Sequence, residues 1–167
     1  AVNLKTGKER WRFWSCTGAP VCMNMSGSAP AVDNGIVYFG CRGGTGFSVT
    51  LAGDCALNAS TGAVIWNQQI GVTGHEDNNG LLIARNGTVY QVYSTVNCYQ
   101  CTYTIDILAL NGATGATMWD KAITGNLNES YRPTGTPTLG PDGTTYQAIS
   151  TSNNPNQPNL FAVNADG

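Results

Sequence analysis

The stretch ALNASTGAVIW occupies residues 56–66, and close copies of it occur twice more in the chain. The copies are AVNLKTGKERW at residues 1–11 and ALNGATGATMW at residues 109–119. Each copy reads Ala-x-Asn-x-x-Thr-Gly-x-x-x-Trp. The final tryptophans are 55 and 53 residues apart, and a fourth copy begins with AVN at residues 162–164. A near-constant spacing of this kind indicates tandem structural repeats.

A second pattern lies between these copies. Each instance has a short run, then Asn-Gly or Asp-Gly, then a second run that ends in tyrosine; the instances are residues 30–38, 81–90 and 137–146. Asn-Gly and Asp-Gly readily adopt the positive φ angles that a tight β-hairpin requires. The pattern therefore predicts two antiparallel strands in every repeat.

Together the two patterns predict four strands per repeat, A to D, with Asn-x-x-Thr-Gly as the C–D turn. In that turn the asparagine side chain can cap the backbone and the glycine can take a left-handed conformation. No segment has helical periodicity. We therefore expect an all-β fold of β-propeller blades, four-stranded antiparallel units in tandem. The chain is expected to form one domain, residues 1–167, with an outer strand over 1–14 and blade repeats over approximately 15–66, 67–119 and 120–167.

The tryptophan motif resembles the tryptophan-docking motif of quinoprotein (PQQ) repeat propellers. Residues 6–11, TGKERW, keep the form Thr-Gly-Lys-Glu-x-Trp that is frequent in that family, although asparagine stands where the family usually has aspartate. The resemblance covers essentially the whole chain. It implies that the side chains of Trp11, Trp66 and Trp119 pack between neighbouring blades.

The resemblance leaves activity open, because a fold alone does not determine function. The family includes alcohol and sugar dehydrogenases, which hold a quinone over calcium, and scaffold propellers without catalysis. We identify no calcium ligand by motif and no adjacent cysteine pair. We therefore expect a structural or binding role more than an enzyme; no catalytic residue and no cofactor is identified, and the cofactor-binding residues stay unknown. The alternative is a fragment of a quinone-dependent alcohol or sugar dehydrogenase, which would bring PQQ and calcium.

Charge and hydropathy limit the classes of partner that the chain is expected to bind. The chain has 167 residues, a net charge of −2 and only 11% charged residues. Such a chain offers no basic patch for a phosphate backbone, so we expect no nucleic acid partner. No apolar run approaches the roughly 20 residues that a membrane-spanning helix needs. The sequence also opens inside a motif, so if the protein is secreted its signal peptide has been removed or lies outside this stretch.

The cysteines favour an oxidising compartment, because an even number in a chain of low charge is typical of disulfides. We expect local pairs: Cys16 with Cys22, Cys41 with Cys55, and Cys98 with Cys101. The segment CYQC at residues 98–101 could instead be half of a zinc site or a redox motif. A structural disulfide fits better, because no second such pair is present and the pair falls in a B–C loop.

Four sequons for N-glycosylation support an extracellular or secreted protein. They begin at Asn24, Asn58, Asn86 and Asn128. We expect glycans on Asn24, Asn86 and Asn128, which fall in the D–A loops or the A–B turn. Asn58 is the capping residue of a C–D turn, so its side chain should be engaged.

The remaining polar residues give weaker signals. Residues 75–79, HEDNN, form the densest polar cluster, which could bind a cation or substrate or be a solvated connection between blades. The spacing matches no metal motif, so we favour the connection. We expect Asp106, Asp120 and Arg132 to be ordinary exposed charges.

Three blades cannot close a ring, so we expect adjoining blades or another copy of the chain to complete the assembly. Residues 9–14, ERWRFW, alternate charged and aromatic side chains, as in a half-buried edge strand. We expect this strand to pair with a C-terminal strand of another copy or an adjoining stretch of chain; between copies this would give a ring or a filament. The alternative is that it folds back on its own first blade and that the C-terminal strand stays an edge. The strand residues concerned are Arg10, Trp11, Arg12 and Phe13 on one side, and Leu160, Phe161, Ala162 and Val163 on the other.

Overall fold

The computed structural model of the chain contains β-strands and no helix among the residues it describes. This confirms the all-β fold that the repeats predict. The strands form three antiparallel sheets that follow one another along the chain. The described residues are 1–13, 24–25, 29–43, 51–69, 81–97, 102–123, 132–150 and 160–165.

Each sheet is an antiparallel meander, except that the first two strands of the first sheet both pair with its third strand. The first sheet contains β1 (Asn24–Met25), β2 (Ala31–Asp33), β3 (Ile36–Gly43), β4 (Leu51–Asn58) and β5 (Val64–Gln69). The second contains β6 (Leu81–Arg85), β7 (Thr88–Asn97), β8 (Thr102–Asn111) and β9 (Thr117–Ala122). The third contains β10 (Arg132–Leu139), β11 (Thr145–Ser150) and β12 (Leu160–Val163). These sheets are the predicted blades.

The first blade differs from the prediction at its inner edge, where strand A is interrupted. β2 pairs with one end of β3 and β1 pairs with the other, at Cys41 and Arg42. Asn24 therefore lies in a paired strand, not in the loop where the sequence analysis placed it. The two-residue strand has no alternation from which it could have been predicted.

The register is the same in every blade. It brings a tyrosine of strand B and an alanine of strand C into one row across the sheet, joined in the first two blades by a tryptophan of strand D. The rows are Tyr38–Ala56–Trp66, Tyr90–Ala109–Trp119 and Tyr146–Ala162. Residues paired across antiparallel strands point to the same side of the sheet. We call this side the forward face, because it faces the next blade along the chain, and the opposite side the rear face.

The A–B turns use positive φ angles, as the sequence predicts, but in two ways. Asn34 (φ 48°) and Gly35 (φ 76°) are both left-handed, and the corresponding residues Asn86 and Gly87 have φ of 53° and 79°. This is the geometry of a two-residue type I′ hairpin. In the third blade only Gly143 has a positive φ (87°), because proline before Asp142 favours a longer turn.

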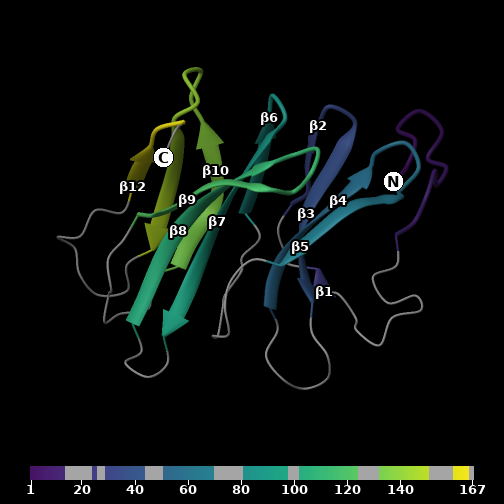
Figure 1. Ribbon diagram of the computed structural model, residues 1–167. Helices are drawn as coiled ribbons and strands as arrows, with labels where there is room; N and C mark the ends of the chain where they lie inside the picture. The colour runs from purple at the N-terminus through teal and green to yellow at the C-terminus, as the bar shows by residue number, and fades with distance from the viewer. Residues whose placement is uncertain are drawn as a thin grey trace.

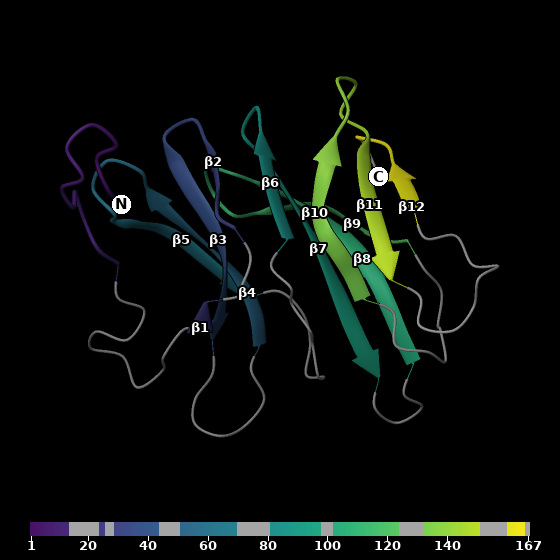
Figure 2. The same cartoon turned by 180° about the vertical axis from the view of Figure 1, so that it is seen from behind.

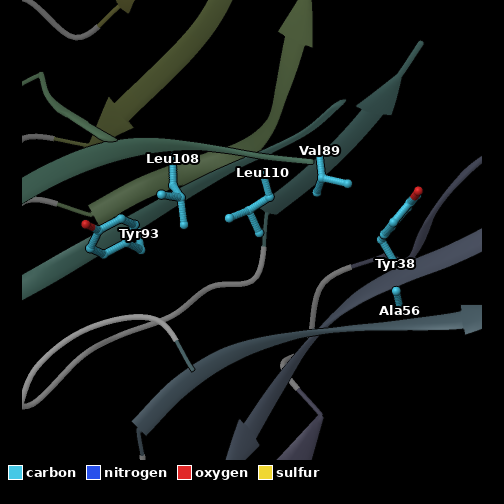
Figure 3. Packing of buried hydrophobic residues seen from close by; sticks show 6 residues of the cluster. All are labelled: Tyr38, Ala56, Val89, Tyr93, Leu108 and Leu110. Carbon is cyan, nitrogen blue, oxygen red and sulfur yellow. The ribbon is translucent and has the colours of Figure 1, made fainter. Parts of the chain in front are cut away.

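The blades lie in a row with the N-terminal hairpin and β12 at opposite ends (Figures 1 and 2). Their first strands, β2, β6 and β10, are in contact with one another in turn. The core is divided into three clusters, each between consecutive units. Figure 3 shows the cluster between the first two blades, where Tyr38 and Ala56 face four residues of the second blade: Val89, Tyr93, Leu108 and Leu110. We call each such contact a seam.

Candidate functional site: the seams between blades

The C–D turn is built identically in all three copies of the motif, and it positions the seam. In the second copy, Asn58 Oδ1 accepts hydrogen bonds from the N–H groups of Ser60 (2.9 Å) and Thr61 (3.0 Å). The N–H of Gly62, whose φ is +74°, donates to the carbonyl oxygen of Asn58. Asn3 and Asn111 make the corresponding bonds. The turn thus satisfies its own polar groups and leaves one carbonyl free to face the neighbouring blade.

That carbonyl is the acceptor for the tryptophan of the preceding blade. The indole N–H of Trp66 donates to the carbonyl oxygen of Gly112 at 2.7 Å, and its ring lies over Gly115. A Cβ at Gly115 would lie 2.8 Å from the ring, so only glycine leaves room for the indole. Trp11 donates in the same way to Ala59 (2.9 Å), and Trp119 to Ala165 (3.0 Å). Each tryptophan is partly buried at a seam.

A tyrosine accompanies the tryptophan at two of the seams. The rings of Tyr38 and Trp66 lie 6.0 Å apart, and so do those of Tyr90 and Trp119. The phenol oxygen of Tyr38 also comes close to Gly112, where a Cβ would collide with it. The sequence analysis noted the recurring tyrosine only as the end of strand B. Its constant position in each repeat was a signal that could have assigned it to the seam.

Polar contacts at the A–B turns complete the seams at their inner edge. The carboxylate of Asp33 accepts a hydrogen bond from the N–H of Gly87 in the second blade at 2.8 Å. The guanidinium of Arg85 donates to the carbonyl oxygen of Gly140 in the third blade at 3.1 Å. At both seams a charged side chain therefore forms a hydrogen bond with the A–B turn of the next blade. The charges can be opposite because the backbone of a turn presents both donors and acceptors. These contacts could not be predicted from a repeat motif, since an aspartate makes one and an arginine makes the other.

The third seam lies between the N-terminal hairpin and the rear face of the first blade. Trp11 and Phe13 pack against four residues of that face, Phe39, Cys41, Cys55 and Leu57. The ring centroids of Phe13 and Phe39 are 5.8 Å apart. Beside Trp11 the seam leaves a mainly apolar hollow of about 330 Å³, bordered by Pro30, Val37 and Leu57 among others. The hairpin itself is held by the bridge between Val2 and Glu9.

The forward face of the third blade is open. Tyr146 has 42% of its surface exposed and Leu160 has 62%. Their partners across the ladder, Ala162 and Ala148, are also exposed. At the two inner seams, the residues in the same register positions are buried. The molecule thus ends in one apolar hollow and one apolar face.

The model of the family described as outer membrane protein assembly factor BamB matches residues 1–165. The chain belongs to this family. This confirms the quinoprotein-type repeat that the tryptophan motif indicates. Among solved structures, BamB from Moraxella catarrhalis is similar at 16% identity with a TM-score of 0.31, covering 81% of this chain and 45% of that chain. The chain therefore spans less than half the length of that protein. No curated protein matches the chain.

One disulfide occurs among the described residues of this BamB-family chain. Cys41 of β3 and Cys55 of β4 are joined, as expected for this pair, with their Cα atoms 5.9 Å apart. Cys41 pairs with Gly53 in the ladder, so the bridge runs diagonally across two neighbouring strands. Both sulfur atoms lie on the rear face, where they contribute to the seam with the N-terminal hairpin. Cys16, Cys22, Cys98 and Cys101 lie outside the described residues.

Asp54 is the most unusual residue of the first seam. It lies on the forward face of the first blade, in register with Gly40 and Gln68, and none of its surface is exposed. Neither carboxylate oxygen has a hydrogen-bond partner among the described residues. Burial raises the pKa of this carboxyl well above its ordinary value, because a low-dielectric environment disfavours the charged form. The sequence analysis missed Asp54, whose counterparts in the other blades are Ile107 and Leu160.

The three charges expected to be exposed fall into different surroundings. Asp106 is partly buried, so that expectation was wrong for it. Burial and the neighbouring charge of Asp120 raise the pKa of Asp106. Asp120 is exposed and accepts a hydrogen bond from the hydroxyl of Tyr93 at 2.8 Å. Arg132 begins β10, and its side chain is not among those described.

Within residues 1–13, 29–43 and the other described ranges, no three acidic, histidine or cysteine side chains come together as metal ligands. The cluster at residues 75–79 lies outside those ranges, as does Asn128. Asn86 lies at an exposed A–B turn, as predicted. No helix among the described residues is long and apolar enough to cross a membrane.

Proposed function

We propose that this chain is a structural and binding protein, a run of propeller blades that associates with further blades, either copies of itself or adjoining chain. Its polar groups are largely engaged in turns and seams, and its strands present apolar faces for packing. Its role on this proposal is to be a repeated building block. It is not proposed to be a self-contained enzyme.

One observation carries the proposal: the open forward face of the third blade. Tyr146 and Leu160 are exposed, whereas the corresponding Tyr90 and Ile107 are 8% and 0% exposed at a seam of the same chain. Apolar area of this kind is stabilised by burial, at about 25 cal/mol per Å². An exposed apolar face whose counterparts are covered by a blade favours another blade as its partner.

We also propose that the protein is extracellular or secreted. The disulfide between Cys41 and Cys55 supports an oxidising compartment, since cytosolic proteins rarely keep such bonds. Peptide mapping without reductant tests the other cysteines, with pairs between Cys16 and Cys22 and between Cys98 and Cys101 expected. Glycopeptide mass spectrometry of the protein from its source should find sugars on Asn24, Asn86 or Asn128 before Asn58. Sugar on Asn58 alone, or six free thiols, would contradict the localisation or the ordering of sites.

The experiment that tests the building-block role is sedimentation velocity on the purified chain over a range of concentrations, followed by electron microscopy of the heaviest species. Rings or filaments are expected. A monomer at every concentration would remove self-association from the proposal and leave adjoining chain as the partner. The dehydrogenase alternative has a separate readout: dye-linked oxidation of alcohols or sugars after addition of PQQ and calcium. Such activity would overturn the structural role.

A further inference from the structure

The seam between the first and second blades defines a seat for a tyrosine. Tyr38 belongs to the same buried cluster as Val89 and Leu110 of the next blade's rear face, and its ring lies beside Trp66. Only 1% of its surface is exposed, although it is among the largest side chains in the core. The seat therefore consists of one tryptophan from the tyrosine's own blade and two aliphatic side chains from the next blade.

Three of the side chains around Tyr38 have counterparts that line the hollow beside Trp11. By register, Val37 of the first blade corresponds to Val89, and Leu57 corresponds to Leu110. Both line the hollow of about 330 Å³, together with Trp11, the counterpart of Trp66. Val37, Leu57 and Trp11 are thus the counterparts of Val89, Leu110 and Trp66. At the seam between the first two blades such side chains surround Tyr38, whereas at the N-terminal seam they border a hollow.

Tyr146 is the tyrosine without a seat. The exposed fractions of Tyr38, Tyr90 and Tyr146 are 1%, 8% and 42%. The first two lie beside the tryptophan of their own blade, while no ring contact to Tyr146 occurs among the described residues. Tyr146 is in register with Ala162 as Tyr38 is with Ala56, so it projects from its sheet in the same way.

We infer that the hollow beside Trp11 receives Tyr146 from a second copy of this chain, so that the contact between copies is a further seam of the kind found within the chain. The inference rests on the proposed self-association and specifies the surfaces that make it. The partner is a second copy because the third blade of this chain presents the tyrosine that the hollow would receive, Tyr146. The N-terminal hairpin and β12 lie at opposite ends of one molecule, so a single chain does not make this contact with itself (Figure 1).

Seating Tyr146 has a steric consequence at the hairpin. Within a blade, the strand-C alanine pairs with both the tyrosine and the tryptophan, as Ala56 does with Tyr38 and Trp66. Ala162 of the arriving copy would therefore take the position that Ala1 now holds beside Trp11. Ala1 accepts a hydrogen bond from Arg10 and its amino group donates to the carbonyl oxygen of Trp11, both at 2.9 Å.

Those two bonds would be exchanged for equivalent ones to β12. Residues 1–8 must leave the segment 9–13, and Val2 and Leu4 are already exposed at 58% and 101%. Residues 1–8 thus compete with the second copy for the backbone groups of this segment. The pairing of residues 10–13 with β12 that the sequence predicts becomes possible only after this displacement.

The first test changes the tyrosine. Replacing Tyr146 by arginine should raise the dissociation constant between copies about 30-fold or more, because an aromatic group would no longer be buried. Met118→Arg is the matched control, since Met118 is 56% exposed on β9, away from both surfaces. Sedimentation velocity gives both constants, and circular dichroism checks that both variants fold. Equal weakening by the two changes, or by neither, would overturn the seat.

The second test shortens the N-terminus. Removing residues 1–8 should strengthen association about tenfold, because the competing hairpin bonds are gone. Removing residues 1–13 should abolish association, because Trp11 and the strand are lost. Weaker association after the shorter deletion would overturn the displacement. If copies associate but ignore Tyr146→Arg, this inference fails and the building-block role stands. If the unaltered chain never associates, self-association itself fails.

Discussion

At the scale of single residues, the glycine beneath each tryptophan sets how closely two blades approach. Gly115 combines a left-handed backbone with direct contact to the Trp66 ring. Gly35 has almost the same φ, +76° against +75°, but a Cβ there would meet nothing within 4 Å. The two positions therefore separate the cost of backbone strain from the cost of blocking the seam.

We predict that Gly115→Ala destabilises the protein more than Gly35→Ala does. Both substitutions force alanine into a left-handed conformation, which costs about 1–2 kcal/mol. Gly115→Ala also forces the indole aside, and overpacking of this kind adds about 1–3 kcal/mol. Urea unfolding followed by tryptophan fluorescence measures both. Equal losses would mean that the ring moves away freely and that the seam does not depend on this contact.

We predict that Asp54 makes the protein less stable as pH rises. Its pKa is raised in the folded state, so between about pH 4, where the unfolded chain releases this proton, and the higher folded pKa, only the folded protein holds it. The free energy of unfolding should fall there by about 1.4 kcal/mol per pH unit. Asp54→Asn should remove most of that slope when unfolding is measured at several pH values, leaving the part due to Asp106, whose pKa is also raised.

Asp142 provides the control of opposite sign. Its carboxylate accepts a hydrogen bond from the N–H of Thr144, which lowers the pKa of Asp142. It therefore stabilises the folded state above its unfolded pKa, and that contribution is lost as pH falls through the folded pKa. Asp142→Asn should alter only the acidic end of the stability profile. If Asp54→Asn leaves the slope above pH 4 unchanged, Asp54 is charged in the folded protein.

The burial of Asp54 could not be predicted from the sequence around it. The flanking GDCAL gives no local sign that this aspartate is buried. Burial comes from the second blade, which covers the forward face regardless of which side chain stands there. A repeat motif predicts positions that recur, such as the tryptophans, and it is silent about a position occupied by aspartate, isoleucine and leucine in turn.

At the scale of elements, the C–D turn was the best-predicted feature. The asparagine cap and the left-handed glycine both follow from residue types that favour that geometry, and the structure contains them three times. The third A–B turn was predicted less well, because only its glycine is left-handed. The interrupted strand A of the first blade was not predicted, since pairing with β3 is decided by the sheet and not by the two residues of β1.

We predict that Asn111→Ala weakens the second blade by about 1–2 kcal/mol, because the N–H groups of Ala113 and Thr114 lose their shared acceptor. Asn111→Asp should cost much less, because a carboxylate oxygen can accept the same two bonds. Thermal unfolding of the three proteins in parallel gives the comparison. Similar losses for alanine and aspartate would show that the turn needs the amide and not merely an acceptor.

At the scale of the whole molecule, the repeats predicted the number and order of the blades but not which faces stay open. Whether a forward face is exposed depends on whether another blade covers it. Tyr146 and Tyr38 are both tyrosines at the same register position, and they differ only in that a blade follows Tyr38. For the same reason the hollow beside Trp11 could not be read from the motif, in which Trp11 and Trp66 are equivalent.

The bond between Cys41 and Cys55 has a mechanical consequence. A chain pulled from its two ends lengthens by at most about 3.5 Å for each residue set free, or about 190 Å for one repeat. The disulfide keeps the 14-residue span between its cysteines from extending under force. The extension of the first blade is therefore shorter by about 50 Å. Optical-tweezer traces should therefore show one short step that lengthens when a reductant enters the chamber, marking the first blade among otherwise similar events.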